Sequence, residues 1–209
     1  MLASCANIVG GVASPAPDLS SFVPSADDPD PSRRIDGVRI ENVENAQHVG
    51  PGQRVAYTAA PPFGGNHDQA WAACNGVVYP EPVRSENLVH SLEHGAVWIA
   101  YDPDRVDAGT VDALAARVEG NPYLVLSPYP GMEQPISLQS WGHQLAVDDA
   151  ADPRIDRFVT ALRINPNTHP EFGASCDEVG RGYFDQDAPP PFVPPPGPDE
   201  IDGSAIVGE

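Results

Sequence analysis

The sequence predicts an α+β protein: a single compact domain with a mixed β-sheet, flanked by extended Pro-rich N- and C-terminal segments. Short apolar runs typical of strands alternate irregularly with amphipathic segments typical of helices, which favours a mixed sheet. The chain has 25 prolines in 209 residues, and those near its two ends favour extended backbone there. We expect a lipobox-like start and flexible spacer over residues 1–45, the globular α+β domain over 46–178, and an acidic Pro-rich tail over 179–209.

Five short segments have strand character, because apolar, β-branched and aromatic residues dominate them and turn-forming residues lie between them. These segments are residues 55–58, 77–79, 96–101, 123–127 and 136–141. The third is apolar throughout and is bounded by Gly95 and Pro103, so we expect it to be buried in the sheet.

Three segments are predicted to be helices. Residues 110–118 carry apolar side chains at helical spacing, and this pattern stops near Gly120. Residues 153–164, which begin with Pro153, also carry apolar side chains at helical spacing. A third, shorter helix is expected before Gly95, with Ser85 as its N-cap and Glu86 in its first turn. Gly95 is well placed to end that helix, because glycine readily adopts the left-handed conformation that follows a helix C-terminus.

Net charge and hydropathy limit the classes of partner. The formal charge is -19, so the surface repels nucleic acid, and we expect no direct contact with it. No run approaches the roughly 20 apolar residues that a transmembrane helix needs.

The motif His90-Ser-Leu-Glu-His94 is the strongest chemical signal in the chain. Residues four apart lie on one face of a helix, so His90 and His94 can hold one metal ion between them. A glycine-containing turn upstream delivers a third imidazole, that of His67, followed by Trp71. We predict that His67, His90 and His94 gather at a shallow pocket near Trp71 and bind zinc or copper.

Two other interpretations of the motif stay open. The letters also match the inverted zinc-peptidase signature, in which His90 and His94 would be ligands, Glu93 the catalytic base and a distant acid such as Glu171 a further ligand. Alternatively, the domain is a purely structural accessory subunit of a membrane or envelope protein complex, and its histidines serve packing. We interpret the three remaining histidines as surface or boundary residues: His48, His143 and His169.

The three cysteines suggest an exported protein. Leu2-Ala3-Ser4-Cys5 has the form of a bacterial lipobox, in which Cys5 receives a lipid, and the spacer that follows suits a tethered domain. Only four residues precede Cys5, so the given start is expected to lie inside a longer precursor. Cys74 and Cys176 then remain, and in an oxidising compartment we expect them to form a disulfide.

A set of motifs across the middle of the chain resembles the bacterial domain-of-unknown-function family 3105, over about residues 47–176. The residues that carry the resemblance are Tyr57, 61–67, Trp71, 76–79, 88–97, Tyr101 and Pro103. The resemblance implies a secreted or membrane-attached protein and brings no particular activity with it. The chain departs from the family pattern in the turn before His67, and also at His143, where an arginine is expected.

Together these observations predict a lipid-anchored domain on the outer face of the cytoplasmic membrane, and we expect a binding protein rather than an enzyme. The Pro-rich run 188–196 is interpreted either as a disordered tail or as a strip that docks on an envelope protein complex.

Overall fold

The computed structural model describes residues 18–180 and 183–196, and the backbone of residues 205–207. Within them lie three α-helices, α1 (Ser85–Glu93), α2 (Ala108–Val118) and α3 (Pro153–Leu162), and two short 3-10 helices, η1 (Ser20–Phe22) and η2 (Pro31–Arg34). None of these helices has the length and apolar composition needed to cross a membrane.

A six-stranded mixed sheet forms the centre of the domain, with strand order β1-β9-β8-β6-β7-β5. The strands β5, β7 and β6 run parallel, and β6, β8, β9 and β1 pair antiparallel. The sheet strands are β1 (Arg39–Ile40), β5 (Asn75–Val78), β6 (Val97–Tyr101), β7 (Leu124–Pro128), β8 (Ile136–Ser140) and β9 (His143–Val147). The predicted fold class, an α+β domain on a mixed sheet, is confirmed.

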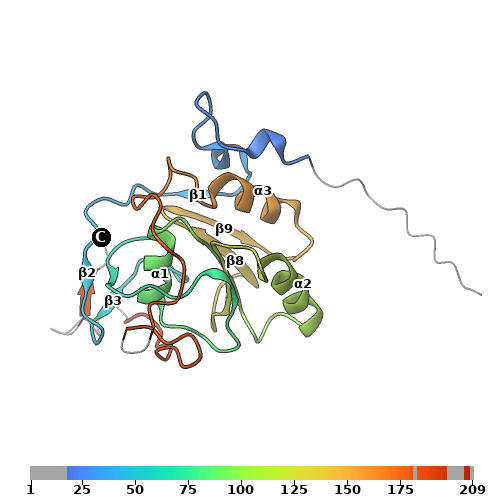
Figure 1. Ribbon diagram of the computed structural model, residues 1–209. Helices are drawn as coiled ribbons and strands as arrows, with labels where there is room; N and C mark the ends of the chain where they lie inside the picture. Colours follow the sequence, from blue (N-terminus) through green and yellow to red (C-terminus); the bar gives the residue numbers. More distant parts are fainter. Residues whose placement is uncertain (1–17, 181–182, 197–204, 208–209) are drawn as a thin grey trace, which may run out of the picture.

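Helices cover both faces of this sheet (Figure 1). Strand β6 shows why: Trp98 and Ala100 belong to the apolar cluster that contains α1, whereas Val97 and Ile99 belong to the cluster that contains α2 and α3. Successive side chains of a strand point to opposite faces of the sheet, so a strand that is apolar throughout is buried only when other elements cover both faces. All five residues of β6 are buried, as the sequence predicted.

Two small parallel pairings lie outside the main sheet. Strand β2 (His48–Val49) pairs with β4 (His67–Asp68), and β3 (Arg54–Ala56) pairs with β10 (Ala205–Val207). The first pairing matters for the candidate site because it places His48 directly opposite His67.

The N-terminal segment differs from the expected flexible spacer. Residues from η1 onward pack against α3, Ile35 is buried, and β1 adds a strand to the edge of the main sheet. Asp30 reaches His143 at the start of β9, with 3.4 Å between its Oδ2 and the histidine Nε2. The apolar side chains among the prolines, such as Phe22 and Ile35, give this segment a face to bury.

The described part of the Pro-rich tail also packs on the domain. Phe184 is buried in the cluster around α1, and the Phe192 ring lies 4.9 Å from that of Tyr129. Pro191 forms an isolated β-bridge with Val83. Thus part of the run expected to be disordered or to dock on a partner contacts its own domain.

Candidate metal centre

Helix α1 carries the His motif inside the domain. Every residue from Ser85 to Glu93 is buried, and His90 and His94 expose only 3% and 2% of their surface. The helix begins at Ser85 itself after an N-cap at Arg84, so the prediction that Ser85 is the N-cap was wrong. Arg84 and Asn87 nevertheless fix this end, since the Asn87 amide N–H donates to the Arg84 carbonyl at 3.2 Å.

Gly95 ends the helix as predicted, with φ of +92°. A Cβ at this position would lie 2.7 Å from Nε2 of His169, so a larger residue would meet both backbone strain and a steric clash. The packed loop that brings His169 against Gly95 also carries Glu171, whose backbone N–H donates to the Glu93 carbonyl at 3.2 Å. Glycine therefore permits the close approach of this loop to the end of α1.

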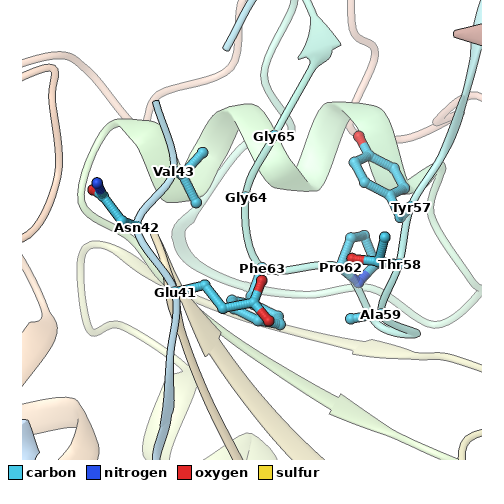
Figure 2. A pocket seen from close by; sticks show the side chains of 10 residues that line it. All are labelled: Glu41, Asn42, Val43, Tyr57, Thr58, Ala59, Pro62, Phe63, Gly64 and Gly65. Carbon is cyan, nitrogen blue, oxygen red and sulfur yellow. The ribbon is translucent and has the colours of Figure 1, made fainter. Parts of the chain in front are cut away.

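The turn before His67 depends on two glycines. Gly65 has φ of +100°, and a Cβ on Gly64 would lie 2.6 Å from Val43 Cγ2. Figure 2 shows this segment passing between Val43 and Tyr57, where a small cavity of about 70 Å³ remains. The chain then enters β4, where the His67 N–H donates to the Gln47 carbonyl at 3.1 Å.

Four imidazole rings gather where β2, β4 and α1 meet. Ring centroids lie 4.8 Å apart for His67 and His90, and 4.6 Å apart for His90 and His94. The three predicted residues are therefore brought together, beside Trp71, whose ring is 4.7 Å from that of His94. Sequence reasoning missed a fourth: the His48 ring lies 4.9 Å from those of both His67 and His90.

Backbone carbonyls fix the orientation of the three buried imidazoles. Nδ1 of His67 lies 2.9 Å from the Gly65 carbonyl oxygen, and Nδ1 of His90 lies 2.6 Å from that of Asp68. Nδ1 of His94 is likewise 2.6 Å from the carbonyl oxygen of Ser175. A carbonyl only accepts, so each Nδ1 carries the hydrogen and each neutral ring keeps its lone pair on Nε2. Metal-binding histidines in proteins are commonly held in this way.

Carboxylates face two of these lone pairs. Oε2 of Glu93 lies 2.9 Å from Nε2 of His67, and Oε2 of Glu171 lies 3.2 Å from Nε2 of His94. The same Glu93 oxygen is 3.9 Å from Nε2 of His48. A carboxylate and a neutral imidazole nitrogen are both acceptors, so such a contact is favourable only when a proton or another cation lies between them.

Burial sets the protonation state of the centre. It lowers the pKa of His90 to about 3, and the neighbouring His67 and His94 add to the effect. Burial also lowers the pKa of His94. Burial opposes ionisation of Glu93, but the adjacent imidazoles, that of His67 above all, outweigh it and lower the Glu93 pKa. At neutral pH His90, His94 and Glu93 therefore have the forms that bind a metal ion.

Two sets of ligand atoms emerge from this geometry among the described residues. Within each set the ligand atoms lie within 4.8 Å of one another. The first set is His48, His67, His90 and Glu93, and the second is His90, His94 and Glu171. The predicted trio is thus divided between two sets that share His90.

The inverted-peptidase interpretation can be compared with these positions. His90, His94 and Glu171 do come together, as that interpretation requires. The carboxylate of Glu93, the supposed catalytic base, instead contacts His67 and belongs to the first set. Glu93 is therefore grouped with the possible ligands of the first set, and its carboxylate faces His67.

A disulfide between Cys74 and Cys176 holds one side of the centre, and this confirms the predicted pairing. The Cys74 N–H donates to the Cys176 carbonyl at 2.9 Å, and the adjacent Ser175 carbonyl accepts from His94. Trp71 Nε1 donates to the Asp177 carbonyl at 2.7 Å. The bridge thus fixes the segment that orients His94 and Trp71.

The interpretation of the other three histidines as surface or boundary residues is only partly right. His143 and His169 are buried, and neither belongs to a ligand set. His48 is half exposed, which fits its interpretation as a surface residue, but that interpretation missed its place in the cluster. Cys5, the expected site of lipid attachment, lies outside the described residues.

Comparison with known proteins agrees with the motif pattern. Residues 48–178 match the model of the DUF3105 family, described as a protein of unknown function. The chain belongs to this family. The matched region begins at His48 and contains both ligand sets and both bridged cysteines. No curated protein and no solved structure matches the chain.

Proposed function

We propose that this DUF3105 domain is an extracytoplasmic, lipid-anchored protein that binds a divalent metal ion through His48, His67, His90 and Glu93. The proposal is supported most directly by the ligand atoms of these four residues, which lie within 4.8 Å of one another. Nε2 of His67 and Nε2 of His48 lie 2.9 Å and 3.9 Å from the same Glu93 oxygen. The backbone carbonyls that accept from Nδ1 of His67 and His90 add to it, because they leave Nε2 free for the ion.

The ligand types favour zinc(II), with copper(II) as the other candidate. Three imidazoles and one carboxylate complete a tetrahedral shell of the kind that zinc prefers. Copper(I) would prefer thiolate or thioether ligands, whereas Cys74 is bridged to Cys176. Bridged sulfur cannot act as a thiolate ligand.

Binding rather than hydrolysis is the better-supported activity. Four protein ligands close a tetrahedral shell and leave no position for a reactive water, as in structural zinc sites. Glu93 would be occupied as a ligand and could not act as a general base.

The proposed location rests on sulfur chemistry. A disulfide persists in oxidising compartments and is rare in the bacterial cytosol, which favours an exported domain. Cys5 is the proposed site of lipid attachment. Replacing Cys5 with Ala in the native precursor should release the protein from the membrane fraction. Unchanged membrane retention, with no acyl mass on the wild-type protein, would contradict the anchor.

Metal binding can be tested on the untagged protein by elemental analysis and by titration with zinc and copper(II) at pH 7. We expect at least one equivalent of zinc and a loss of affinity of at least about 100-fold in His90→Gln. His169→Gln is a matched control, because its Nδ1 also lies against a backbone carbonyl, that of Glu93 at 3.1 Å, but it belongs to neither ligand set. Its affinity should stay within about twofold of wild type. If neither ion binds at micromolar concentration, the proposal is contradicted and the alternative, a structural accessory subunit, is favoured.

A further inference from the structure

The cluster can be divided into two halves of the same composition. His48, His67 and Glu93 form one half, and His90, His94 and Glu171 form the other. Each half has two imidazoles and one carboxylate. In each half one contact brings a carboxylate oxygen against an imidazole Nε2, at 2.9 Å for Glu93 and His67 and at 3.2 Å for Glu171 and His94.

His90 can bind only one ion at a time. Its Nδ1 lies 2.6 Å from the Asp68 carbonyl oxygen and carries the hydrogen, so Nε2 is the single nitrogen available. A lone ion can therefore have the four ligands of the first set. If a second ion takes His90, each ion keeps three protein ligands.

We propose that the cluster accommodates a second divalent ion on His90, His94 and Glu171, with His90 passing from the first ion to the second. This inference rests on the proposed metal binding by the first set. It explains the contact between His94 and Glu171. Nδ1 of His94 donates to the Ser175 carbonyl, so the Nε2 lone pair and the Glu171 carboxylate are two acceptors facing each other, and a bound ion would satisfy both.

The second ion should bind more weakly than the first. Two dications side by side repel each other, and the two carboxylates Glu93 and Glu171 offset only part of their charge. Glu171 is also 45% exposed, against 12% for Glu93, so water competes more effectively for its ligand position. The exposure of Glu171 gives this ion direct access from solvent.

Double occupancy would change the chemistry of the centre. Each ion would hold three protein ligands and one open position, which is the arrangement of catalytic rather than structural zinc sites. Paired ions of this kind bind hydroxide or the oxygens of a small oxyanion. The first ion alone would leave the shell closed.

Zinc titration followed by native mass spectrometry and calorimetry tests the second site. Wild-type protein should bind two equivalents, the second at least about tenfold more weakly. Glu171→Gln should lose the second equivalent and keep the affinity for the first within about twofold. Glu133→Gln removes the charge of another exposed carboxylate, outside both sets, and should keep both equivalents.

The outcomes separate this inference from the proposed function. One equivalent in wild type, or two equivalents retained in Glu171→Gln, would overturn the second site and leave the first intact. No binding in wild type would overturn the proposed function itself. If Glu171→Gln lost both equivalents while its circular dichroism stayed native, Glu171 would belong to the first ion's shell and the division into halves would be wrong.

Discussion

Two regions of the molecule bring a buried imidazole against a carboxylate, and they differ in the number of imidazoles. At the start of β9, Nδ1 of His143 lies 2.6 Å from the Trp141 carbonyl oxygen and Nε2 faces Asp30. That contact involves one imidazole and one carboxylate, so a single proton between them satisfies it. In the cluster, His90 lies between His67 and His94, so protonating several rings would place like charges side by side.

The comparison shows that a contact between histidine and carboxylate is not by itself a sign of a metal site. What distinguishes the cluster is that several lone pairs converge on few carboxylate oxygens, more than single protons can satisfy without repulsion. A bound divalent ion would satisfy the lone pairs of one ligand set at once. The Asp30 and His143 pair is therefore the internal reference for the predictions that follow.

The largest effect, on the free energy of unfolding, should come from removing the disulfide, which lies beside the cluster and not beside the Asp30 and His143 pair. Cys74 and Cys176 are 102 residues apart, and the chain-entropy estimate for such a loop is about 4 to 5 kcal/mol. The double variant Cys74→Ala/Cys176→Ala should lose about that much free energy of unfolding in urea. Its affinity for the proposed second zinc ion should fall as well, because Ser175 no longer holds His94, a ligand of that ion, firmly. A loss below about 1 kcal/mol would show that packing alone fixes the segment.

Replacing one imidazole in each region tests directly whether zinc affinity depends on the cluster alone. His67→Gln should weaken zinc binding by at least about 100-fold, or roughly 2.7 kcal/mol, because it removes a ligand. His143→Gln should leave zinc affinity within about twofold. Isothermal calorimetry at pH 7 measures both. Equal losses in the two variants would mean that zinc affinity reports general stability rather than ligation.

The reference pair should give a pH effect of its own. Burial raises the pKa of Asp30, but hydrogen bonds from His143 and Ser32 outweigh it and lower the pKa from 3.8 to about 2. The folded state therefore holds fewer protons than the unfolded state between these values. The stabilisation, about 2 kcal/mol, is present above pH 4 and is lost as the pH falls towards 2.

Asp30→Asn should remove this stabilisation. Urea unfolding at pH 6 should show a loss of about 2 kcal/mol, and the difference from wild type should shrink as the pH falls to 2. Zinc affinity should not change. A difference that stays constant from pH 6 to pH 2 would show that the carboxylate charge is not what stabilises the N-terminal segment.

The smallest effect should come from the exposed ligand of the cluster. His48 is 50% exposed, so water replaces its nitrogen more easily than it replaces a buried one. His48→Gln should weaken zinc binding by about tenfold, or 1.4 kcal/mol. The free energy of unfolding without metal should stay within about 0.5 kcal/mol of wild type. A loss as large as that of His67→Gln would show that exposure does not weaken this ligand.

Local patterns predicted much of the fold. Strand β6 was recognised from its unbroken apolar run, and α3 from apolar residues at helical spacing. Strand β9 was missed, although Leu145 and Val147 alternate with less buried residues and Gly142, with φ of +69°, marks the turn before it. The two-residue strands β1, β2 and β4 carry no periodicity, so only tertiary contacts define them.

The candidate site was predictable only as far as its residues lie in recognisable local structure. His90 and His94 follow from the geometry of one helix, and the turn before His67 supplied the third member. His48 could not be found in this way, because the parallel pairing of β2 with β4 brings it there. The contact of Glu93 with His67 likewise depends on how the turn approaches α1.

The packed part of the chain begins near Phe22, so the linker between the proposed anchor and the domain is shorter than the sequence predicted. Phe22 already packs against the cluster under α2 and α3, only 17 residues after Cys5. A fully extended chain of that length spans at most about 60 Å, against about 140 Å for the 40 residues between Cys5 and the expected domain boundary at 45. A domain anchored at Cys5 would therefore remain near the membrane surface.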